Sequence, residues 1–344
     1  MWQTIGQTRI ISLFEHGLGN KSLAHAYLFT GPEHIGKMTL ATELAMALNC
    51  EGNAPPCHEC SACKKIAAGN HADVLVIRLT PGEEDAEEGT VAEATKISIE
   101  QIKDIQHSAS LPPFEGKQRV YIIEGAEQMS IEAANRLLKT LEEPPDKVTF
   151  ILITSNDKLL LSTVVSRCQK LEFQPMPLEE EAEALTKKIN LVPERARLLA
   201  ALSRGCPGWA ITAAGDENVL TERDFQLNRV FSIIKDTDER FAYAAQLASG
   251  FSQNRKAVYD ILNIWKDYWR DIMLVKTGCP QLIINIDRKD EIIKIAEGYS
   301  LGKIRGFIKS IEAAARQLEQ NVNARLALEV LMLDLPRSET VHSV

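Results

Sequence analysis

The sequence lacks the features of a membrane or secreted protein. No apolar run in its 344 residues approaches the roughly 20 residues that a transmembrane helix requires. The N-terminus, Met1-Trp-Gln-Thr-Ile-Gly, has neither the basic region nor the apolar region of a signal peptide. These absences argue against membrane-spanning and secreted classes, so we expect a cytoplasmic protein without a membrane partner.

Positive charge is also scarce. The chain has 39 Lys and Arg against 47 Asp and Glu, which gives a net charge of −8. A net acidic chain offers no broad surface for nucleic acid, so any DNA contact should be local or shared with partners. With 45% hydrophobic and 25% charged residues, the composition is that of an ordinary soluble protein. The length suggests two or three domains.

A phosphate-loop pattern is present. Gly31, Gly36 and Lys37 fit the spacing G-x-x-x-x-G-K, between a strand predicted over residues 26–30 and a helix predicted over residues 38–48. In that context backbone N–H groups and the helix N-terminus face an anion, and Lys37 reaches the outer phosphates. The alternative is a chance match in an ordinary strand–loop–helix.

The metal ligand of this loop is missing. Met38 stands where a Ser or Thr hydroxyl should hold Mg²⁺, and a thioether is a poor ligand for a hard cation. Thr39 comes one position late and is rotated by about 100° around the helix, so we do not expect it to substitute. Gly31, Gly36, Lys37 and Thr39 are therefore candidate phosphate contacts of a degenerate nucleotide site.

Four of the seven cysteines form a cluster with the spacing C-x₆-C-x₂-C-x₂-C, namely Cys50, Cys57, Cys60 and Cys63. Overlapping C-x-x-C spacings favour tetrahedral thiolate ligation of Zn²⁺. Four protein ligands leave no open position, so we expect a structural role. An iron–sulfur cluster also fits the spacing. Disulfides are a third alternative, which a cytosolic setting disfavours.

Strands and helices alternate through about residue 175. Strands are predicted over residues 74–77, as a buried strand, and over 119–124 and 148–154. Ser98 and Gln101 form a predicted capping box at one helix start, and Pro144 ends a helix over residues 130–141. The acidic stretch from Thr80 to Thr95 is predicted to be a solvated loop. This alternation indicates an α/β fold with a parallel sheet covered on both faces.

Only helices are expected after Gln174-Pro-Met-Pro177. A small helical unit runs to about residue 215, and longer amphipathic helices follow, including residues 254–277 and 320–335. In the last helix one stripe contains Val322, Leu326, Val330 and Leu333. We therefore predict domains over residues 1–175, 176–216 and 217–344.

Several of these segments together resemble the AAA+ clamp-loader family of bacterial DNA polymerase III. They are His25-Ala-Tyr-Leu-Phe-Thr-Gly-Pro, the cysteine cluster, Ala134-Asn-Arg-Leu-Leu-Lys-Thr-Leu-Glu-Glu-Pro-Pro145 and Ser166-Arg167-Cys168. The resemblance covers the first 175 residues closely and extends more weakly to the end. It implies a RecA-like AAA+ P-loop domain with a zinc module at 50–63, a three-helix lid and an all-α collar that mediates oligomerisation.

The family contains motor subunits and a stator-like subunit, and the departures from the motor pattern distinguish them. The resemblance places Glu124 and Gly125 at the Walker B position, where a motor has Asp-Glu. Glu124 retains the ability to hold a metal, but Gly125 cannot polarise water. Gly208 stands at the lid position of a sensor arginine. Thr154 and Ser155 fall at the first sensor position, with simple packing as the alternative.

Ser166-Arg167-Cys168, in contrast, is intact. The resemblance implies that Arg167 points out of its own domain at the ATP of a neighbouring subunit, as a trans arginine finger. Such a finger contributes about 10³–10⁵ in rate, and the planar guanidinium suits phosphate oxygens. The alternative is that Arg167 caps a helix or pairs with a surface carboxylate.

The resemblance thus implies a stator-like subunit without turnover of its own, within the DNA polymerase III holoenzyme, a DNA-directed DNA polymerase. Its partners would be the gamma/tau motor subunits, the delta subunit, the sliding clamp and, through the complex, primer-template DNA. ATP binding without hydrolysis stays open because Lys37 is retained. One alternative is an active gamma/tau-like ATPase, which Met38, Gly125 and Gly208 oppose. Another is a zinc-dependent nucleic-acid-binding protein, which the acidic balance opposes.

Overall fold

A computed structural model of the chain describes residues 2–79, 96–234, 236–320 and 322–337. The predicted loop from Thr80 to Thr95 lies outside these residues. The chain forms two compact units, Met1–Glu181 with Gly205–Trp209, and Ala182–Arg204 with Ala210–Val344. The first unit contains the sheet and the second is helical. The division into three domains expected from the sequence stays a prediction.

The first unit is built on a parallel sheet of five strands in the order β2-β3-β4-β1-β5. The strands are β1 (Ala26–Thr30), β2 (Val74–Ile77), β3 (Arg119–Glu124), β4 (Val148–Thr154) and β5 (Gln169–Glu172). In the centre, Tyr27 of β1 lies opposite Ile151 of β4 and Gln169 of β5. Because every pair is parallel, all amino ends meet at one edge of the sheet and all carboxyl ends at the other.

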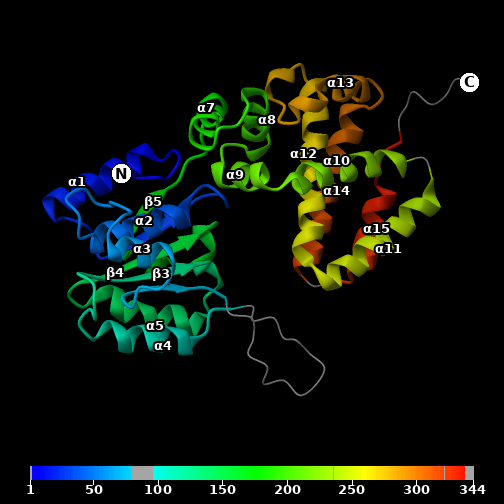
Figure 1. The fold of residues 1–344 in the computed structure, drawn as a ribbon. Coiled ribbons are helices and arrows are strands. Elements are labelled where there is room, and N and C mark those ends of the chain that lie inside the picture. The colour runs from blue at the N-terminus through cyan, green and yellow to red at the C-terminus, as the bar shows by residue number, and fades with distance from the viewer. Residues whose placement is uncertain (1, 80–95, 235, 321, 338–344) are drawn as a thin grey trace, which may run out of the picture. The chain divides into compact units, whose positions relative to one another are not determined.

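Helices cover both faces of this sheet (Figure 1). One face carries α1 (Thr8–Asn20), α2 (Lys37–Asn49) and α3 (Ser61–Ala67), and the other carries α4 (Ile99–Ala109) and α5 (Ile131–Glu142). Alternate residues of a strand enter opposite cores: Tyr27 and Phe29 pack beneath α1 and α2, whereas Leu28 packs against α4 and α5. The predicted parallel sheet with two covered faces is confirmed.

Local sequence signals set the helix ends. The predicted capping box is present, since Gln101 N donates to Ser98 Oγ at 3.3 Å and Ser98 N donates to Gln101 Oε1 at 2.9 Å. Helix α5 ends at Glu142, two residues before Pro144, which cannot continue a helix.

Two strands differ from expectation. The prediction that residues 74–77 form a buried strand is wrong, because Leu75 and Val76 are 39% and 37% exposed. Strand β2 lies at the edge of the sheet and pairs only with β3, so its side chains are less covered. Strand β5 was not predicted, because in its sequence, Gln-Lys-Leu-Glu, only Leu171 is buried.

The helical unit has its own core. The helices after β5 are α7 (Leu178–Ile189), α8 (Pro193–Ser203), α9 (Pro207–Gly215), α10 (Glu217–Ser232), α11 (Thr237–Gln253), α12 (Arg255–Lys276), α13 (Lys289–Glu297), α14 (Leu301–Glu319) and α15 (Ala324–Leu333). Trp265 and Trp269 of α12 are fully buried among them. None of the described residues after Glu172 is in a strand, as predicted, and no described helix is long and apolar enough to span a membrane.

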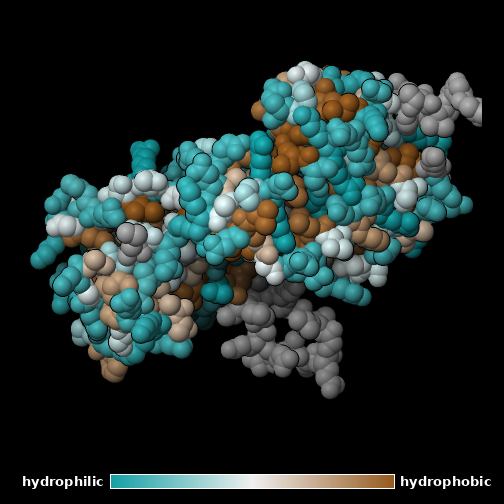
Figure 2. Space-filling view, turned by 45° about the horizontal axis from the view of Figure 1, so that its top comes forward, coloured by the Kyte–Doolittle hydropathy of each residue, from teal (hydrophilic) through white to brown (hydrophobic). Residues whose placement is uncertain are grey.

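The predicted apolar stripe at the C-terminal helix faces outward, and its first residue, Val322, lies before α15, which begins at Ala324 and not at residue 320 as predicted. Its four residues are 45–59% exposed, namely Val322, Leu326, Val330 and Leu333. The core contacts of α15 come instead from Ala327, Leu328, Leu331 and Met332. Apolar residues also reach the surface of this unit in the view of Figure 2.

Candidate functional site

The phosphate loop joins β1 to α2 at the carboxyl edge of the sheet, as the sequence predicts. Its glycines are required by the backbone. Gly31 has φ 144°, and a Cβ there would lie 2.8 Å from the carbonyl oxygen of Phe173. Gly36 has φ 99° and immediately precedes α2. The loop therefore keeps the shape of an anion cradle at a helix N-terminus.

Lys37 is held by its own loop. The residue is only 7% exposed, and its Nζ donates to the carbonyl oxygens of Gly31 and Pro32, each at 2.6 Å. Burial lowers the pKa of the Lys37 ammonium, and nearby carboxylates oppose that shift. The loop carbonyl oxygens thus accept hydrogen bonds from the Lys37 ammonium group. Without these contacts that group would be available to bind a phosphate.

The residues after Lys37 do not restore a metal site. Met38 packs against the hydrophobic core beneath α2, and Thr39 is exposed. An apolar side chain therefore occupies the position that the motif assigns to a Mg²⁺ ligand.

The Walker B position is also altered. Glu124 ends β3 at the same edge as the phosphate loop, and its Oε2 lies 3.6 Å from Nε of Arg78. Gly125 has φ 70° and precedes the 3₁₀ turn η1 (Ala126–Gln128); a Cβ at Gly125 would lie 2.6 Å from Oε1 of Gln128. A glutamate at position 125 would be strained in this backbone.

Gly208 allows a backbone contact with the phosphate loop. Its N–H donates to the carbonyl oxygen of His34 at 2.8 Å, and a Cβ at Gly208 would lie 2.6 Å from that same oxygen. The start of α9 therefore rests directly on the loop. The position where the resemblance expects a sensor arginine has no room for a side chain without movement of the loop.

Glu127 is a site residue that the sequence interpretation missed. Its Oε1 accepts hydrogen bonds from N and Oγ of Ser155, at 3.3 and 3.0 Å, and its Oε2 is buried without a hydrogen-bond partner. Its charge raises the pKa of Lys37, against the effect of burial. Buried Thr154 instead accepts from N of Asn156 at 3.0 Å. The signal that could have found Glu127 is a second carboxylate just beyond the end of β3.

Arg167 lies at the opposite edge of the sheet. It precedes β5 by two residues, whereas the phosphate loop follows β1. The two edges are separated by the length of β1, five residues or about 17 Å. That distance exceeds the reach of an arginine side chain. The structure therefore does not bring Arg167 together with the other predicted site residues of its own chain.

The Arg167 side chain is 34% exposed and has local partners. One amino group is paired with Glu142 Oε1, and the other donates to the carbonyl oxygen of Thr163 at 3.0 Å. Glu142 is 48% exposed, and an ion pair this accessible contributes at most about 1 kcal/mol. Both contacts expected of a merely structural arginine are therefore present.

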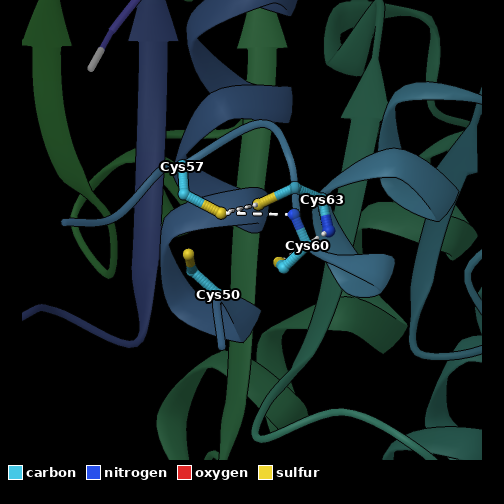
Figure 3. Close-up of side chains that lie close together, drawn as sticks. All are labelled: Cys50, Cys57, Cys60 and Cys63. Carbon is cyan, nitrogen blue, oxygen red and sulfur yellow. Dashed lines mark hydrogen bonds between the residues drawn. The ribbon is translucent and has the colours of Figure 1, made fainter. Parts of the chain in front are cut away.

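The four clustered cysteines converge on one point (Figure 3). Their sulfur atoms all lie within 4.8 Å of one another, and the sulfurs of Cys57 and Cys63 are 3.9 Å apart. Tetrahedral ligation with bonds near 2.3 Å places sulfurs about 3.8 Å apart. All seven cysteines are free, so no disulfide competes for the cluster. The geometry fits one metal ion held by Cys50, Cys57, Cys60 and Cys63.

The surrounding backbone favours thiolates. N–H groups of Gly52, Cys60 and Cys63 each donate to a cluster sulfur at 3.4 Å. Donation from the N–H groups of Cys60 and Glu59 lowers the pKa of Cys57 to about 6, whereas burial raises the pKa of Cys63 to about 12. A bound cation would deprotonate such thiols outright, which completes the fit.

The same module is tied to the N-terminal segment. Buried Glu43 of α2 accepts from N of Gln3 at 2.5 Å and from N of Thr4 at 3.1 Å, and Nε2 of His58 lies 3.5 Å from its Oε1. His58 lies between Cys57 and Cys60 in the sequence. The cysteine cluster and the N-terminal segment are therefore both connected to Glu43 of α2.

The chain is similar to known proteins over most of its length. The family "DNA polymerase III, delta subunit" matches residues 6–177, and "DNA polymerase III, delta subunit, C terminal" matches residues 223–337. DNA polymerase III subunit delta' of Bacillus subtilis is 29% identical over 96% of both chains. Subunit tau of the same organism is 36% identical over 96% of this chain, which spans 60% of tau.

Among solved structures, one match is a DNA polymerase III gamma subunit-related protein from Thermotoga maritima. It has a TM-score of 0.44 and 19% identity, and covers 94% of this chain and 98% of its own. The matches to the two delta-subunit families include the phosphate-loop unit and the C-terminal helices. On that evidence, the chain belongs to the DNA polymerase III delta-subunit family.

Proposed function

We propose that the chain is the stator-like, delta-prime type of subunit of a bacterial clamp loader. It would assemble with gamma/tau motor subunits and a delta subunit in the cytoplasm, and the complex would load the sliding clamp onto primed DNA. The observation that carries the proposal is the contrast between Arg167, which is accessible, and a phosphate loop whose cation is already satisfied.

The chain's own phosphate site is proposed to have no turnover. Phosphoryl transfer requires a Mg²⁺ ion and a positioned water. Met38 removes a metal ligand, Gly125 removes the base, and Glu124 is paired with Arg78. Lys37 remains as the one phosphate-binding cation of the loop, so nucleotide binding without hydrolysis is the most that this site retains.

Arg167 is proposed to act in the ATP site of an adjacent motor subunit. Its position at the amino edge, about 17 Å from the chain's own loop, supports a role outside its own site. On assembly the guanidinium would exchange Glu142 for phosphate oxygens, to which it can donate in a bidentate fork. Glu142 would hold the finger in place until then.

The helical unit is proposed to be the lid and collar, with the collar over residues 217–344 joining the subunits. The exposed face of α15 with Leu326, Val330 and Leu333 supports this, because an apolar helix face of that kind is suited to packing against another helix. The cysteine cluster is proposed to hold structural Zn²⁺, since four thiolates leave no open coordination position.

The decisive experiment is Arg167→Ala in the reconstituted complex. Single-turnover hydrolysis at the receiving site is expected to slow by about 10³-fold or more, with assembly retained by size-exclusion chromatography. Arg195→Ala is a matched control, because Arg195 is 36% exposed and also has a surface carboxylate, Glu217, at 3.9 Å. Unchanged hydrolysis in an intact Arg167→Ala complex would remove the finger assignment.

The rival function, an active motor, is tested with the isolated chain. Mg-ATP turnover stimulated by primed DNA and abolished by Lys37→Ala would establish that function in place of the stator-like one.

A further inference from the structure

The N-terminal segment, residues 3–7, lies against the phosphate loop. Thr4 is 7% exposed, and a Cβ at Gly36 would lie 3.7 Å from Cγ2 of Thr4. Gly36 immediately precedes α2, and at this end of a phosphate loop the backbone N–H groups face the anion. The segment therefore contacts the loop at the end where a nucleotide phosphate would bind.

A buried carboxylate holds the beginning of this segment. Glu43 is 3% exposed and lies in the second turn of α2. It accepts hydrogen bonds from N of Gln3 at 2.5 Å, and from N and Oγ1 of Thr4 at 3.1 and 2.5 Å. Hydrogen bonds to a charged acceptor are about twice as strong as those between neutral groups. The carboxylate therefore fixes two successive peptide groups of the segment.

The other end of the segment is held by its own backbone pairing. The side chain of Gln7 donates to the carbonyl oxygen of Gln174 at 2.8 Å and accepts from N of Gln174 at 3.3 Å. Between the two anchors, Gly6 has φ 76°, and a Cβ there would lie 2.7 Å from Sδ of Met176. The segment is thus fixed at both ends, with a glycine at its close contact with Met176.

The loop beneath the segment is engaged from within. The ammonium of Lys37 donates to loop carbonyl oxygens, and the carbonyl oxygen of His34 accepts from N of Gly208. The glycines that shape an anion cradle are nevertheless retained. The loop therefore has the backbone of a phosphate site, with its cation occupied and one end in contact with the N-terminal segment.

The polar character of the anchor separates a strap from ordinary packing of a chain end. A buried carboxylate is costly unless hydrogen-bonded donors surround it. Glu43 receives three of its hydrogen bonds from the segment and also lies 3.5 Å from Nε2 of His58. Departure of the segment would remove those three donors, so the position of the segment and the state of α2 are coupled.

We propose that residues 3–7 form an autoinhibitory strap, which Glu43 holds against the phosphate loop and which keeps nucleoside di- and triphosphates out of this site. The inference rests on the proposed function only in treating the loop as the remnant of a nucleotide site. When the bonds to Glu43 are broken, Thr4 is free to leave Gly36, and Lys37 can exchange the loop carbonyls for phosphate oxygens.

Binding of a fluorescent ADP analogue to the full chain tests the strap. Glu43→Ala removes the acceptor and is expected to tighten binding by about tenfold or more, because apparent affinity scales with the fraction of open chains. The control is Thr42→Val, which removes a neighbouring α2 hydroxyl that donates to the carbonyl oxygen of Met38 at 2.9 Å. Its affinity should stay within about twofold of wild type. Equal affinities in wild type and Glu43→Ala, or no binding to either, would overturn the proposal.

Thr4→Val tests the same contact without removing the buried carboxylate. It keeps a methyl group against Gly36 but loses the hydroxyl bond to Glu43, so hydrogen exchange in residues 3–7 should quicken and ADP affinity should rise by several-fold. Faster exchange in this segment with the affinity of wild type would contradict the strap.

A double variant shows which site the nucleotide enters. Adding Lys37→Ala to Glu43→Ala should return ADP affinity to the wild-type level, and binding that persists would place the nucleotide elsewhere and refute the proposal. The strap and the arginine finger fail separately. In the reconstituted complex Glu43→Ala should retain the hydrolysis that depends on Arg167, whereas Arg167→Ala should leave ADP binding by the isolated chain unchanged.

Discussion

The two edges of one parallel sheet differ in how their side chains are held. At the carboxyl edge, Lys37 is 7% exposed and donates to loop carbonyls, Glu124 pairs with Arg78, and Ser155 donates to Glu127. At the amino edge, Arg167 is 34% exposed and also has local partners, Glu142 and the carbonyl oxygen of Thr163, whereas Phe114 is 83% exposed on a loop whose N–H groups donate to buried Asp73. In such folds ligands usually bind at the carboxyl edge. Under the proposed function, the contacts of this subunit with a neighbour's ATP would lie at the other end of the strands.

Metal removal should have the largest effect on stability, and the first residues to lose structure should lie at the amino edge. Chelation, or Cys63→Ser, is expected to lower the free energy of unfolding by several kcal/mol, because ligation energy contributes directly to folding. Hydrogen exchange should show loss of protection in residues 110–118 before any change at the phosphate loop. Metal analysis should find about one zinc per chain; a fully folded, metal-free protein would refute the site.

Arg167→Lys sharpens the assignment of the finger. Lysine keeps the charge but lacks the planar fork that matches phosphate oxygens. We expect single-turnover hydrolysis at the receiving site to remain at least about 10²-fold below wild type. Glu142→Gln, which removes only the partner, should change the rate by no more than about threefold. Full activity in Arg167→Lys would mean that only a positive charge is needed.

The hydrogen bonds between the buried Asp73 carboxylate and the N–H groups of residues 114–116 should be sensitive to acid. The pKa of Asp73 is about 2 in the fold, below the 3.8 of a free carboxyl. A lowered pKa contributes stability that is complete above about pH 4 and is lost as the pH falls toward 2, an effect of about 2 kcal/mol. Urea unfolding between pH 5 and pH 2.5 should therefore show a shallower pH dependence in Asp73→Asn than in wild type. Parallel curves would show that Asp73 is not the responsible group.

Gly208→Ala tests the contact between the start of α9 and the phosphate loop at the carboxyl edge. The new Cβ would meet the carbonyl oxygen of His34, so we expect a destabilisation of about 1–3 kcal/mol in urea unfolding. Gly215→Ala is the matched control in the same helix, because no atom lies within 4 Å of its Cβ position. That variant should be neutral or slightly stabilising. Equal effects of the two substitutions would mean that the contact of α9 with the loop is not formed in solution.

Lys37→Ala should have the smallest effect on function. Since the ammonium is bound by its own loop, hydrolysis by the reconstituted complex should stay within about twofold of wild type. A larger loss would mean that the phosphate loop at the carboxyl edge contributes to ATP hydrolysis by the complex.

Much of the fold could be predicted from local signals. The phosphate loop, the capping box at Ser98 and the end of α5 before Pro144 follow from short-range rules on backbone conformation. The edge position of β2 and the existence of β5 could not be predicted, because both depend on which strand pairs with which. The stripe containing Leu326 was recognised, but periodicity cannot tell a face that packs on the core from one that is free.

The sequence by itself determined which groups are available: the four clustered thiols, a methionine at position 38, a glycine at position 125 and an arginine at position 167. Residue types and spacings along the chain are enough to state these. Only the tertiary structure decided where the groups lie, placing Arg167 and the phosphate loop at opposite strand ends and aiming Glu127 at Ser155. It also brought Asp73, Asn49 and Lys65 around the loop of Phe114. These contacts join residues dozens of positions apart, and strand order and packing, which no local pattern encodes, bring them together.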